Sequence, residues 1–181
     1  MPPGRLSSKS VYSGKFLDVT RDQVELPGGK IADLEVIRHP GASAVVPLHP
    51  DRSVTLIRQY RYAADGFILE VPAGKLDPGE SPESCALREI VEEAGVRAAS
   101  LHSLGWIFTT PGFTDEKIHL FAATSLTPAS QSLDDDEVIE VLRLPLAEAL
   151  RLASTGAIRD AKSLCALYRT SQELEAGRLG V

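Results

Sequence analysis

Apolar and polar positions along the chain mark a series of short extended segments, most of them before residue 75. Residues 11–26 are expected to be extended, the Pro-Gly-Gly sequence at 27–29 is typical of a turn, and residues 30–38 are expected to return as a strand. Leu26 and Ile31 are predicted to pair across this hairpin. Further strands are predicted at 42–48, 54–59, 67–71, 104–109, 118–123 and 138–144.

Helix-end signals and apolar spacing predict three helices. Ser81 is a suitable N-cap, Pro82 suits the first helical position, and Gly95 is a suitable C-terminal glycine. A second helix is predicted from Pro145 to about residue 155, and a third, capped by Asp160, to about residue 176. Strands followed by a helix, more strands and two helices predict the α/β class, with a mixed β-sheet between helices.

The chain is expected to contain two parts. Residues 1–40 are predicted to form a small antiparallel β-sheet, and residues 41–181 the main domain, while the polar residues 1–10 are expected to be a loose arm. A hairpin of this size is marginal alone. We therefore expect it to pack on the rest of the chain or on a second copy, as a dimerisation element.

Composition narrows the possible partners. The 181 residues carry a formal charge of −6, from 19 basic and 25 acidic side chains, which disfavours nucleic-acid binding through the global field. The two cysteines make no disulfide framework or zinc motif, and the four histidines show no zinc or triad spacing. No apolar run approaches the roughly 18 residues of a membrane span. A soluble cytoplasmic protein is expected.

The predicted first helix carries both an apolar and an acidic stripe. Its apolar positions follow the i, i+3, i+4, i+7 spacing of one helical face and are Leu87, Ile90, Val91 and Ala94. Glu89, Glu92 and Glu93 lie nearly opposite and repel one another. A solvated acidic face would explain them, with Arg88 pairing to Glu92. Alternatively, they bind a hard cation, for which oxygen ligands select Mg²⁺ or Mn²⁺.

The segment around this helix resembles a known signature. Residues 74–96 read GKLDPGESPESCALREIVEEAGV and resemble the Nudix hydrolase box, G-x5-E-x7-R-E-U-x-E-E-x-G-U, where U is apolar. All nine constrained positions match, namely Gly74, Glu80, Arg88, Glu89, Ile90, Glu92, Glu93, Gly95 and Val96. The resemblance implies the Nudix fold (α/β/α), divalent cations and hydrolysis of a nucleoside diphosphate linked to another group.

The resemblance also implies roles for individual residues in metal binding. Glu89 and Glu93 are implied as the main metal ligands, with Glu92 and the carbonyl of Ala73 as further ligands. Gly74, Glu80 and Arg88 are implied as support of the metal site. For Glu80 and Arg88, a purely loop-fixing role is an equal alternative.

Three other segments resemble the ADP-ribose pyrophosphatases within this family. They are Phe67–Gly74 (FILEVPAG), Thr110–Glu116 (TPGFTDE) and Arg58–Arg61 (RQYR). The resemblance implies ADP-ribose as the leading substrate, with another nucleotide sugar such as GDP-mannose close behind. Glu70, Gly112 and Phe113, which lie within these segments, are the implied substrate-binding residues.

Pyrophosphate hydrolysis needs cationic side chains for a phosphate and a base for the attacking water. Arg58 and Arg61 are the phosphate candidates, although Arg61 is also compatible with an ordinary surface ion pair. In the family, a loop like the acidic run 132–137 supplies a catalytic glutamate. By register against the following strand, Asp135 and Glu137 stand at the positions of the two carboxylates that this loop supplies in the family, Asp135 being shorter than the family's glutamate. Glu116 and Glu92, which lie outside the loop, are the other catalytic candidates.

A homodimer with exchanged N-terminal sheets is expected, both because the small sheet needs a partner and because of the family resemblance. Phe16 and Arg38 would then reach the adenine or a phosphate bound to the partner. Two alternatives stay open at this point: a nucleotide-sugar-binding module without catalysis, and an RNA cap or 5′-triphosphate pyrophosphohydrolase. The acidic balance weighs against RNA.

Overall fold

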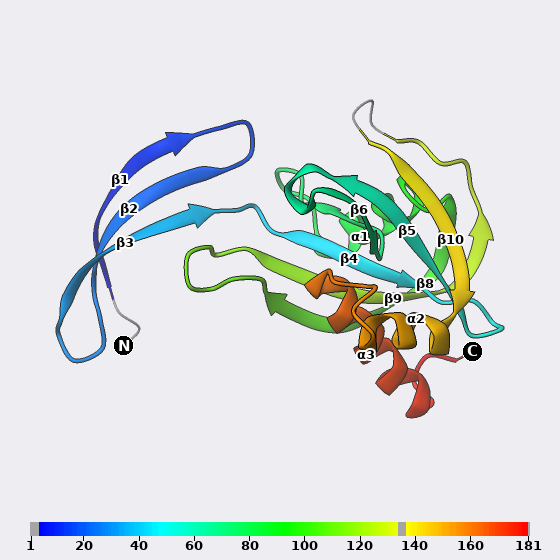
Figure 1. The fold of residues 1–181 in the computed structure, drawn as a ribbon. Coiled ribbons are helices and arrows are strands. Elements are labelled where there is room, and N and C mark those ends of the chain that lie inside the picture. Colours follow the sequence, from blue (N-terminus) through cyan, green and yellow to red (C-terminus); the bar gives the residue numbers. More distant parts are fainter. Residues whose placement is uncertain (1–3, 134–136, 181) are drawn as a thin grey trace. The chain divides into compact units, whose positions relative to one another are not determined.

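The computed structural model describes residues 4–133 and 137–180. The chain forms two compact units, one of Met1–Gly41 with Phe108–Lys117 and the other of Ala42–Ile107 with Ile118–Val181 (Figure 1). The short segment 108–117 therefore belongs with the N-terminal residues, although it lies far from them in the sequence. In the described part of the chain, no helix is long and apolar enough to cross a membrane.

The N-terminal unit is built on an antiparallel three-stranded sheet in the order β1-β2-β3. Its strands are β1 (Arg5–Ser13), β2 (Asp18–Glu25) and β3 (Ile31–Arg38). The prediction of a loose arm over residues 1–10 is wrong from Arg5 onward, because β1 pairs along the length of β2. Every residue of β1 is exposed, so its sequence has no buried face and no alternation to reveal it.

The β2–β3 hairpin forms where it was predicted, with a register one residue different. Glu25, not Leu26, pairs with Ile31, because the Leu26 N–H already closes the turn by donating to the Lys30 carbonyl at 2.8 Å. Gly28 and Gly29 both have positive φ, which glycine adopts without a steric penalty.

In the part of the second unit that the structure describes, the strands form two sheets. The first is mixed, in the order β7-β4-β9-β8, and consists of β4 (Ala42–Pro47), β7 (Ala73–Lys75), β8 (Val96–Phe108) and β9 (Lys117–Pro128). Strands β4 and β9 are parallel, whereas β4 and β7 are antiparallel. The other sheet is antiparallel, in the order β10-β5-β6, and consists of β5 (Ser53–Arg61), β6 (Gly66–Glu70) and β10 (Ile139–Pro145).

The described residues of this unit also form the α-helices α1 (Pro82–Glu92), α2 (Leu146–Ser154) and α3 (Ala161–Glu175) and the 3₁₀ turn η1 (Tyr62–Ala64). The predicted caps are present. The Ser81 side chain accepts a hydrogen bond from Ser84 N–H, and Asp160 accepts one from Ser163 N–H. Gly95 follows α1 with φ +64°, as a helix-ending glycine does.

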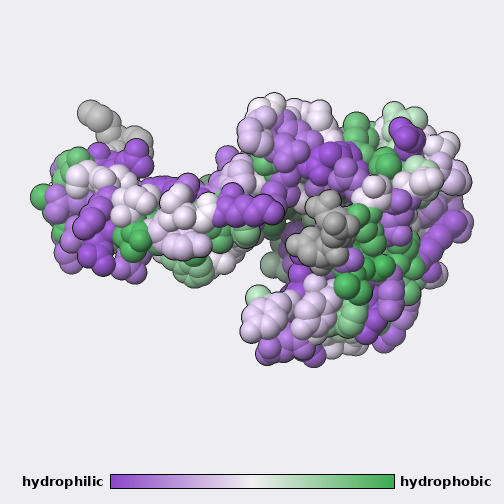
Figure 2. All heavy atoms as spheres, turned by 90° about the horizontal axis from the view of Figure 1, so that it is seen from above, coloured by the Kyte–Doolittle hydropathy of each residue, from purple (hydrophilic) through white to green (hydrophobic). Residues whose placement is uncertain are grey.

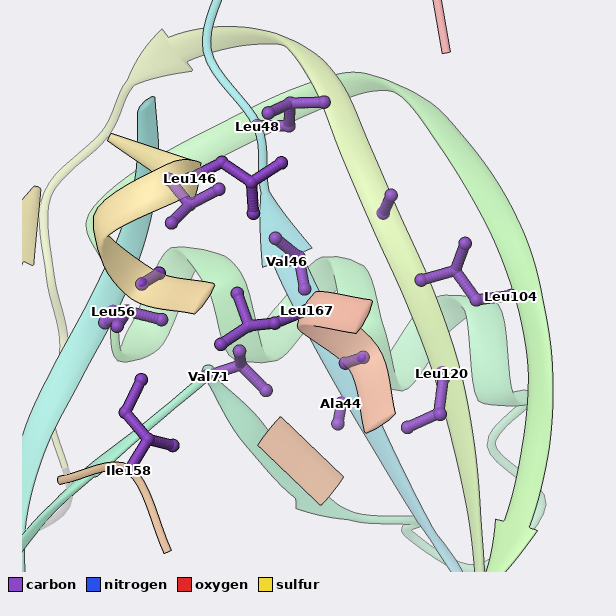
Figure 3. Close-up of a cluster of buried hydrophobic side chains, with 14 of the residues drawn as sticks. Ala44, Val46, Leu48, Leu56, Val71, Leu104, Leu120, Leu146, Ile158 and Leu167 are labelled. Carbon is purple, nitrogen blue, oxygen red and sulfur yellow. The ribbon is translucent and has the colours of Figure 1, made fainter. Parts of the chain in front are cut away.

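Strand β4 separates two apolar clusters. Ala44, Val46 and Leu48 face the larger cluster, which is closed by side chains from β5, α2 and α3 (Figure 3). Val45 belongs to the second cluster, together with Ala86 and Ile90 of α1. Successive side chains of a strand point to opposite faces, so a strand buried on both faces lacks polar alternation. The mixed sheet lies between α1 and the other helices, which confirms the predicted α/β architecture.

Candidate active site

One arginine on α1 gathers three carboxylates. Arg88 donates from Nε and Nη2 to the two oxygens of Glu80, each at 2.9 Å. Its Nη1 donates to Glu89 Oε1 at 2.7 Å and to Glu92 Oε2 at 2.9 Å. Hydrogen bonds from Arg88 are the main reason that the pKa of Glu80 is lowered to about 2. Arg88 thereby offsets the repulsion that neighbouring carboxylates on one helix would otherwise cause.

Glu89 and Glu93 are buried, which the helical pattern did not predict. They are 8% and 2% exposed, whereas Leu87, placed on the predicted apolar stripe, is 39% exposed. Burial raises the pKa of Glu89 to about 7, against the opposing charge of Arg88. Burial also raises the pKa of Glu93 to about 8, although its carboxylate accepts a 2.8 Å hydrogen bond from Ala73 N–H. Carboxylates placed this way favour a bound proton or a bound cation.

Gly74 provides the space in which the Glu89 carboxylate lies. A Cβ atom at position 74 would be 1.6 Å from Glu89 Oε1 and 2.1 Å from its Cδ. Strand β7 holds this glycine in place through antiparallel pairing of Gly74 with Ser43 on β4. The close approach of backbone and carboxylate therefore requires glycine.

These donors fit a hard divalent cation. Glu89, Glu92 and Glu93 offer carboxylate oxygens. Ala73 offers a carbonyl oxygen, and its N–H donates a hydrogen bond to Glu93. Within residues 4–133 and 137–180, no three acidic or His/Cys side chains form a preassembled cage. Arg88 pairs with both Glu89 and Glu92. Mg²⁺ does not need such a cage, because it binds through one or two carboxylates, waters and substrate phosphates.

The free energy of unfolding of the metal-free protein is expected to fall as pH rises from about 5 to about 8. The raised pKa values of Glu89 and Glu93, caused chiefly by burial, mean that the folded state binds more protons than the unfolded chain in this window. This contribution is fully present below the ordinary carboxyl pKa and is lost as pH rises through about 7 and 8.

Urea unfolding at several pH values in EDTA would measure this dependence. Millimolar Mg²⁺ should reduce the decline, because a bound cation takes the place of the protons. Stability that rises steadily from pH 5 to pH 8 in EDTA would contradict the assignment.

Backbone hydrogen bonds are made by residues on either side of the acidic run. Ser132 N–H donates to the carbonyl of Glu92 at 3.1 Å, at the end of α1. The carbonyl of Val138 accepts from Tyr60 N–H at 3.2 Å. Ser132 is therefore beside the end of the carboxylate helix, and Val138 is beside β5.

Glu137 is close enough to the buried pair to act on it electrostatically. Its charge adds to the effect of burial in raising the pKa of both Glu89 and Glu93. Asp135, the other catalytic candidate of this loop, lies outside the described residues. Of these two catalytic candidates, only Glu137 lies within the described residues.

Arg61 and Glu70, both predicted as substrate-binding residues, form an ion pair in which the carboxylate is buried and the guanidinium is partly exposed. Arg61 Nη2 lies 2.7 Å from Glu70 Oε2, and Glu70 is 3% exposed. Lys162 at the start of α3 contacts the same oxygen at 3.3 Å. Sequence reasoning missed Lys162, and the available signal was a cation in the first turn of a helix, where the macrodipole disfavours it.

Arg58 has other partners. Its guanidinium lies 4.1 Å from the ring centroid of Phe67 and 3.0 Å from a Glu140 carboxylate oxygen across the β5–β10 pair. Phe67 in turn makes an edge-to-face contact with Tyr60. Arg58 therefore pairs with Glu140, whereas Arg61 pairs with Glu70.

The remaining candidates belong to the N-terminal unit. Arg38 pairs with Asp22 and, from Nη1, with Asp115 Oδ2 at 2.9 Å. Phe16 makes an edge-to-face contact with His39. These charges and rings are held within the unit that also contains segment 108–117.

Segment 108–117 is joined to the end of β3. The carbonyl of Phe113, which follows Gly112, accepts from Ile37 N–H at 2.8 Å, and the Phe113 side chain is 53% exposed. Glu116 Oε2 accepts from the Thr109 hydroxyl at 2.8 Å, and its Oε1 lies 3.5 Å from His39 Nε2. The structure thus brings Glu116 together with His39, whereas Glu89, Glu92, Glu93 and Glu137 belong to the second unit.

Comparison with known proteins agrees with this architecture. A model of the NUDIX domain matches residues 37–167, and a model of the nucleoside diphosphate sugar hydrolase N-terminal domain matches residues 5–37. A solved structure described as an ADP compounds hydrolase superposes with a TM-score of 0.84 at 28% identity, covering 99% of this chain and 98% of that one.

Two curated relatives illustrate the similarity in sequence. ADP-ribose pyrophosphatase of Bacillus subtilis (strain 168) is 38% identical over 164 residues, covering 90% of this chain and 89% of the relative. GDP-mannose pyrophosphatase of Cronobacter sakazakii is 39% identical over 153 residues, covering 75% and 79%. The fold is of the α/β class, and its mixed sheet carries a helix with two buried glutamates, Glu89 and Glu93. The chain belongs to the Nudix family, whose hydrolases generally need a divalent metal ion.

Proposed function

We propose that the protein hydrolyses the pyrophosphate bond of ADP-ribose in an Mg²⁺-dependent or Mn²⁺-dependent reaction, giving AMP and ribose 5-phosphate. The observation that carries the proposal is the buried pair Glu89 and Glu93 beside the Gly74 backbone, with raised carboxyl pKa values caused chiefly by burial. The similarity to a Bacillus subtilis ADP-ribose pyrophosphatase supports this choice of substrate.

The division of labour among the residues follows from their contacts. Glu89, Glu93, Glu92 and the Ala73 carbonyl would hold the metal, with Arg88 and Glu80 fixing the orientation of the helix carboxylates. A bound divalent ion supplies charge neutralisation at the pyrophosphate and lowers the pKa of water.

Arg61 would hold a phosphate group. Glu70 occupies the edge of the guanidinium formed by Nε and Nη2. The second edge of the planar guanidinium can take phosphate oxygens. Arg58, which stacks on Phe67, is the other candidate.

A carboxylate would accept a proton from the attacking water as its oxygen bonds to phosphorus and the bridging P–O bond breaks. Glu137 is the first choice among the catalytic candidates, because its charge acts on Glu89 and Glu93. Asp135, Glu116 and Glu92 are the alternatives. Gly112 and Phe113 would contact the substrate from segment 108–117.

A nucleotide-sugar panel in ¹⁸O-labelled water tests the function. We expect Mg²⁺-dependent turnover of ADP-ribose, and the labelled product identifies which phosphorus is attacked. The alternative substrate, GDP-mannose, is favoured by the similarity to the Cronobacter sakazakii enzyme and would give the higher kcat/KM if it is correct. Tight ADP-ribose binding without any product would instead favour a non-catalytic binding module.

The N-terminal sheet is proposed to be a dimerisation element, exchanged between two copies. Hydrophobic and hydrophilic side chains are mixed on the surface of the N-terminal unit (Figure 2), and Leu6, Val11 and Tyr12 of β1 are each more than half exposed. A small sheet gains stability by covering such residues. Phe16 and Arg38 would then contribute to the partner's site. Sedimentation equilibrium should give about twice the mass of 19.5 kDa, and a monomer would contradict this.

We propose that the protein is cytoplasmic. Cys85 and Cys165 are free thiols, and burial is the main cause that raises the pKa of Cys85 to about 12. Thiols persist in a reducing compartment.

A further inference from the structure

Lys162 lies in a position that is unusual for a lysine. It is the second residue of α3, and its side chain is only 11% exposed. Lysine is rarely buried unless it is paired, and the first turn of a helix disfavours a cation. Its Nζ lies 3.3 Å from Glu70 Oε2 and 3.0 Å from Asp160 Oδ2. Those two carboxylates offset the cost of placing a cation there.

Glu70 is shared between two cations. Oε2 of this carboxylate takes both Arg61 Nη2, at 2.7 Å, and Lys162 Nζ, at 3.3 Å. Asp160 balances part of the charge of Lys162. Oε2 of Glu70 is divided between Lys162 and Arg61, so Glu70 holds the Arg61 guanidinium less tightly than it would hold a sole cationic partner. Without Lys162, the buried Glu70 would have Arg61 as its cationic partner and would hold it more tightly.

The start of α3 is connected to the carboxylate helix by hydrogen bonds between backbone N–H groups and side chains. Asp160 caps α3 through Ser163 N–H at 2.9 Å, and the Ser163 hydroxyl accepts from Val71 N–H at 2.8 Å. Two residues further along the chain, Ala73 N–H donates to Glu93. The Lys162 ammonium group is therefore held relative to the chain segment that reaches Glu93.

Arg61 connects this cluster to the buried carboxylates. Burial raises the pKa of Glu93, and the charge of Arg61 is one of the influences that oppose the rise. The guanidinium is thus close enough to Glu93 for a field effect, while its Nε–Nη2 edge is held by Glu70. A phosphate group held near Glu93 would meet the same guanidinium.

We propose that Lys162 is a positioning residue for nucleotide-sugar binding. By sharing Glu70 with Arg61, Lys162 fixes the carboxylate that orients the guanidinium and preserves positive charge on Arg61 for a substrate phosphate. The inference rests on the proposed function and adds to it a residue that does not itself touch the substrate.

A double-mutant cycle with Glu70 tests the proposal. Lys162→Met should raise the Kd for ADP-ribose by about tenfold, measured by calorimetry in EDTA. In turnover assays it should raise KM by about the same factor, with little change in kcat. Lys162→Arg should recover most of the affinity, because the charge returns. In the Glu70→Gln background, Lys162→Met should have no further effect, because the shared carboxylate charge is already gone.

Arg159→Met is the matched control, since Arg159 is an exposed cation three residues earlier whose guanidinium contacts the Gly156 carbonyl. Thermal unfolding of each variant checks the fold, and Lys162→Gln replaces Lys162→Met if the latter unfolds. An equal loss of ADP-ribose affinity in Arg159→Met would overturn the proposal. An undiminished effect of Lys162→Met in the Glu70→Gln background would also overturn it, because it would indicate that Lys162 contacts the phosphate directly. Normal affinity of Lys162→Met overturns the inference alone. Wild-type protein that neither binds nor hydrolyses any nucleotide sugar overturns the proposed function as well.

Discussion

Replacing Glu93 by Gln is expected to lower kcat for the nucleotide-sugar substrate on the order of 10³-fold, since a metal ligand contributes several kcal/mol to transition-state stabilisation. The amide has nearly the same shape as the carboxylate, and its oxygen can still accept the hydrogen bond from Ala73 N–H, which is 2.8 Å in the native protein. The fold should therefore persist while the charge disappears.

The same substitution should stabilise the metal-free protein at pH 8. Burial raises the pKa of Glu93 to about 8, so its ionisation near this pH works against folding, and a neutral amide avoids that cost. Glu93→Gln should consequently also flatten the decline of stability between about pH 5 and pH 8. Urea unfolding in EDTA at pH 6 and pH 8 measures both effects.

A glutamate on the same helix provides the control for this experiment. Glu83 is exposed in the first turn of α1, so Glu83→Gln removes an equal charge outside the buried pair. We expect it to keep kcat within about threefold, because exposed surface substitutions usually have small effects. Wild-type kcat in Glu93→Gln would rule out Glu93 as a metal ligand.

The second large effect is expected for Gly74→Ala, with kcat/KM reduced by about 100-fold. The new Cβ would lie 1.6 Å from Glu89 Oε1, so the carboxylate must move. That movement would break the 2.7 Å contact with Arg88 Nη1. Because the displaced atoms are the end of a side chain and not backbone, thermal unfolding should change little.

Activity and thermal unfolding of Gly74→Ala must be measured together. Gly4→Ala is the control, since a Cβ at Gly4 would meet nothing within 4 Å. Loss of activity with an unchanged unfolding temperature supports a displaced Glu89. Native kcat/KM in Gly74→Ala would mean that the position of the Glu89 carboxylate does not matter for turnover.

Local signals in the sequence were sufficient for most secondary structure in the second unit. Ser81, Pro82 and Gly95 marked the ends of α1, and Asp160 marked the start of α3, because caps and turns depend on a few neighbouring residues. Strand β8 begins at Val96, eight residues before the predicted 104; in its first half, partly buried and exposed positions alternate only over residues 96–100, and no residue there is fully buried. Residues 5–10 of β1 were missed because every residue of that strand is exposed.

The sequence by itself determined the family, the α/β architecture and the set of carboxylates on α1, since these depend on residue type and spacing along one element. Only the tertiary structure decided which face of α1 is buried, because Glu89 and Glu93 are covered by a backbone that approaches at Gly74.

Tertiary structure also decided which residues share a charge. Lys162 and Arg61 lie about a hundred residues apart and meet at one oxygen of Glu70. Likewise, segment 108–117 joins the N-terminal sheet through hydrogen bonds to Ile37. Contacts between residues distant in the chain do not change the hydrophobic periodicity of either segment, so the sequence pattern cannot reveal them. The electrostatic field at a buried group depends on all of its neighbours in space.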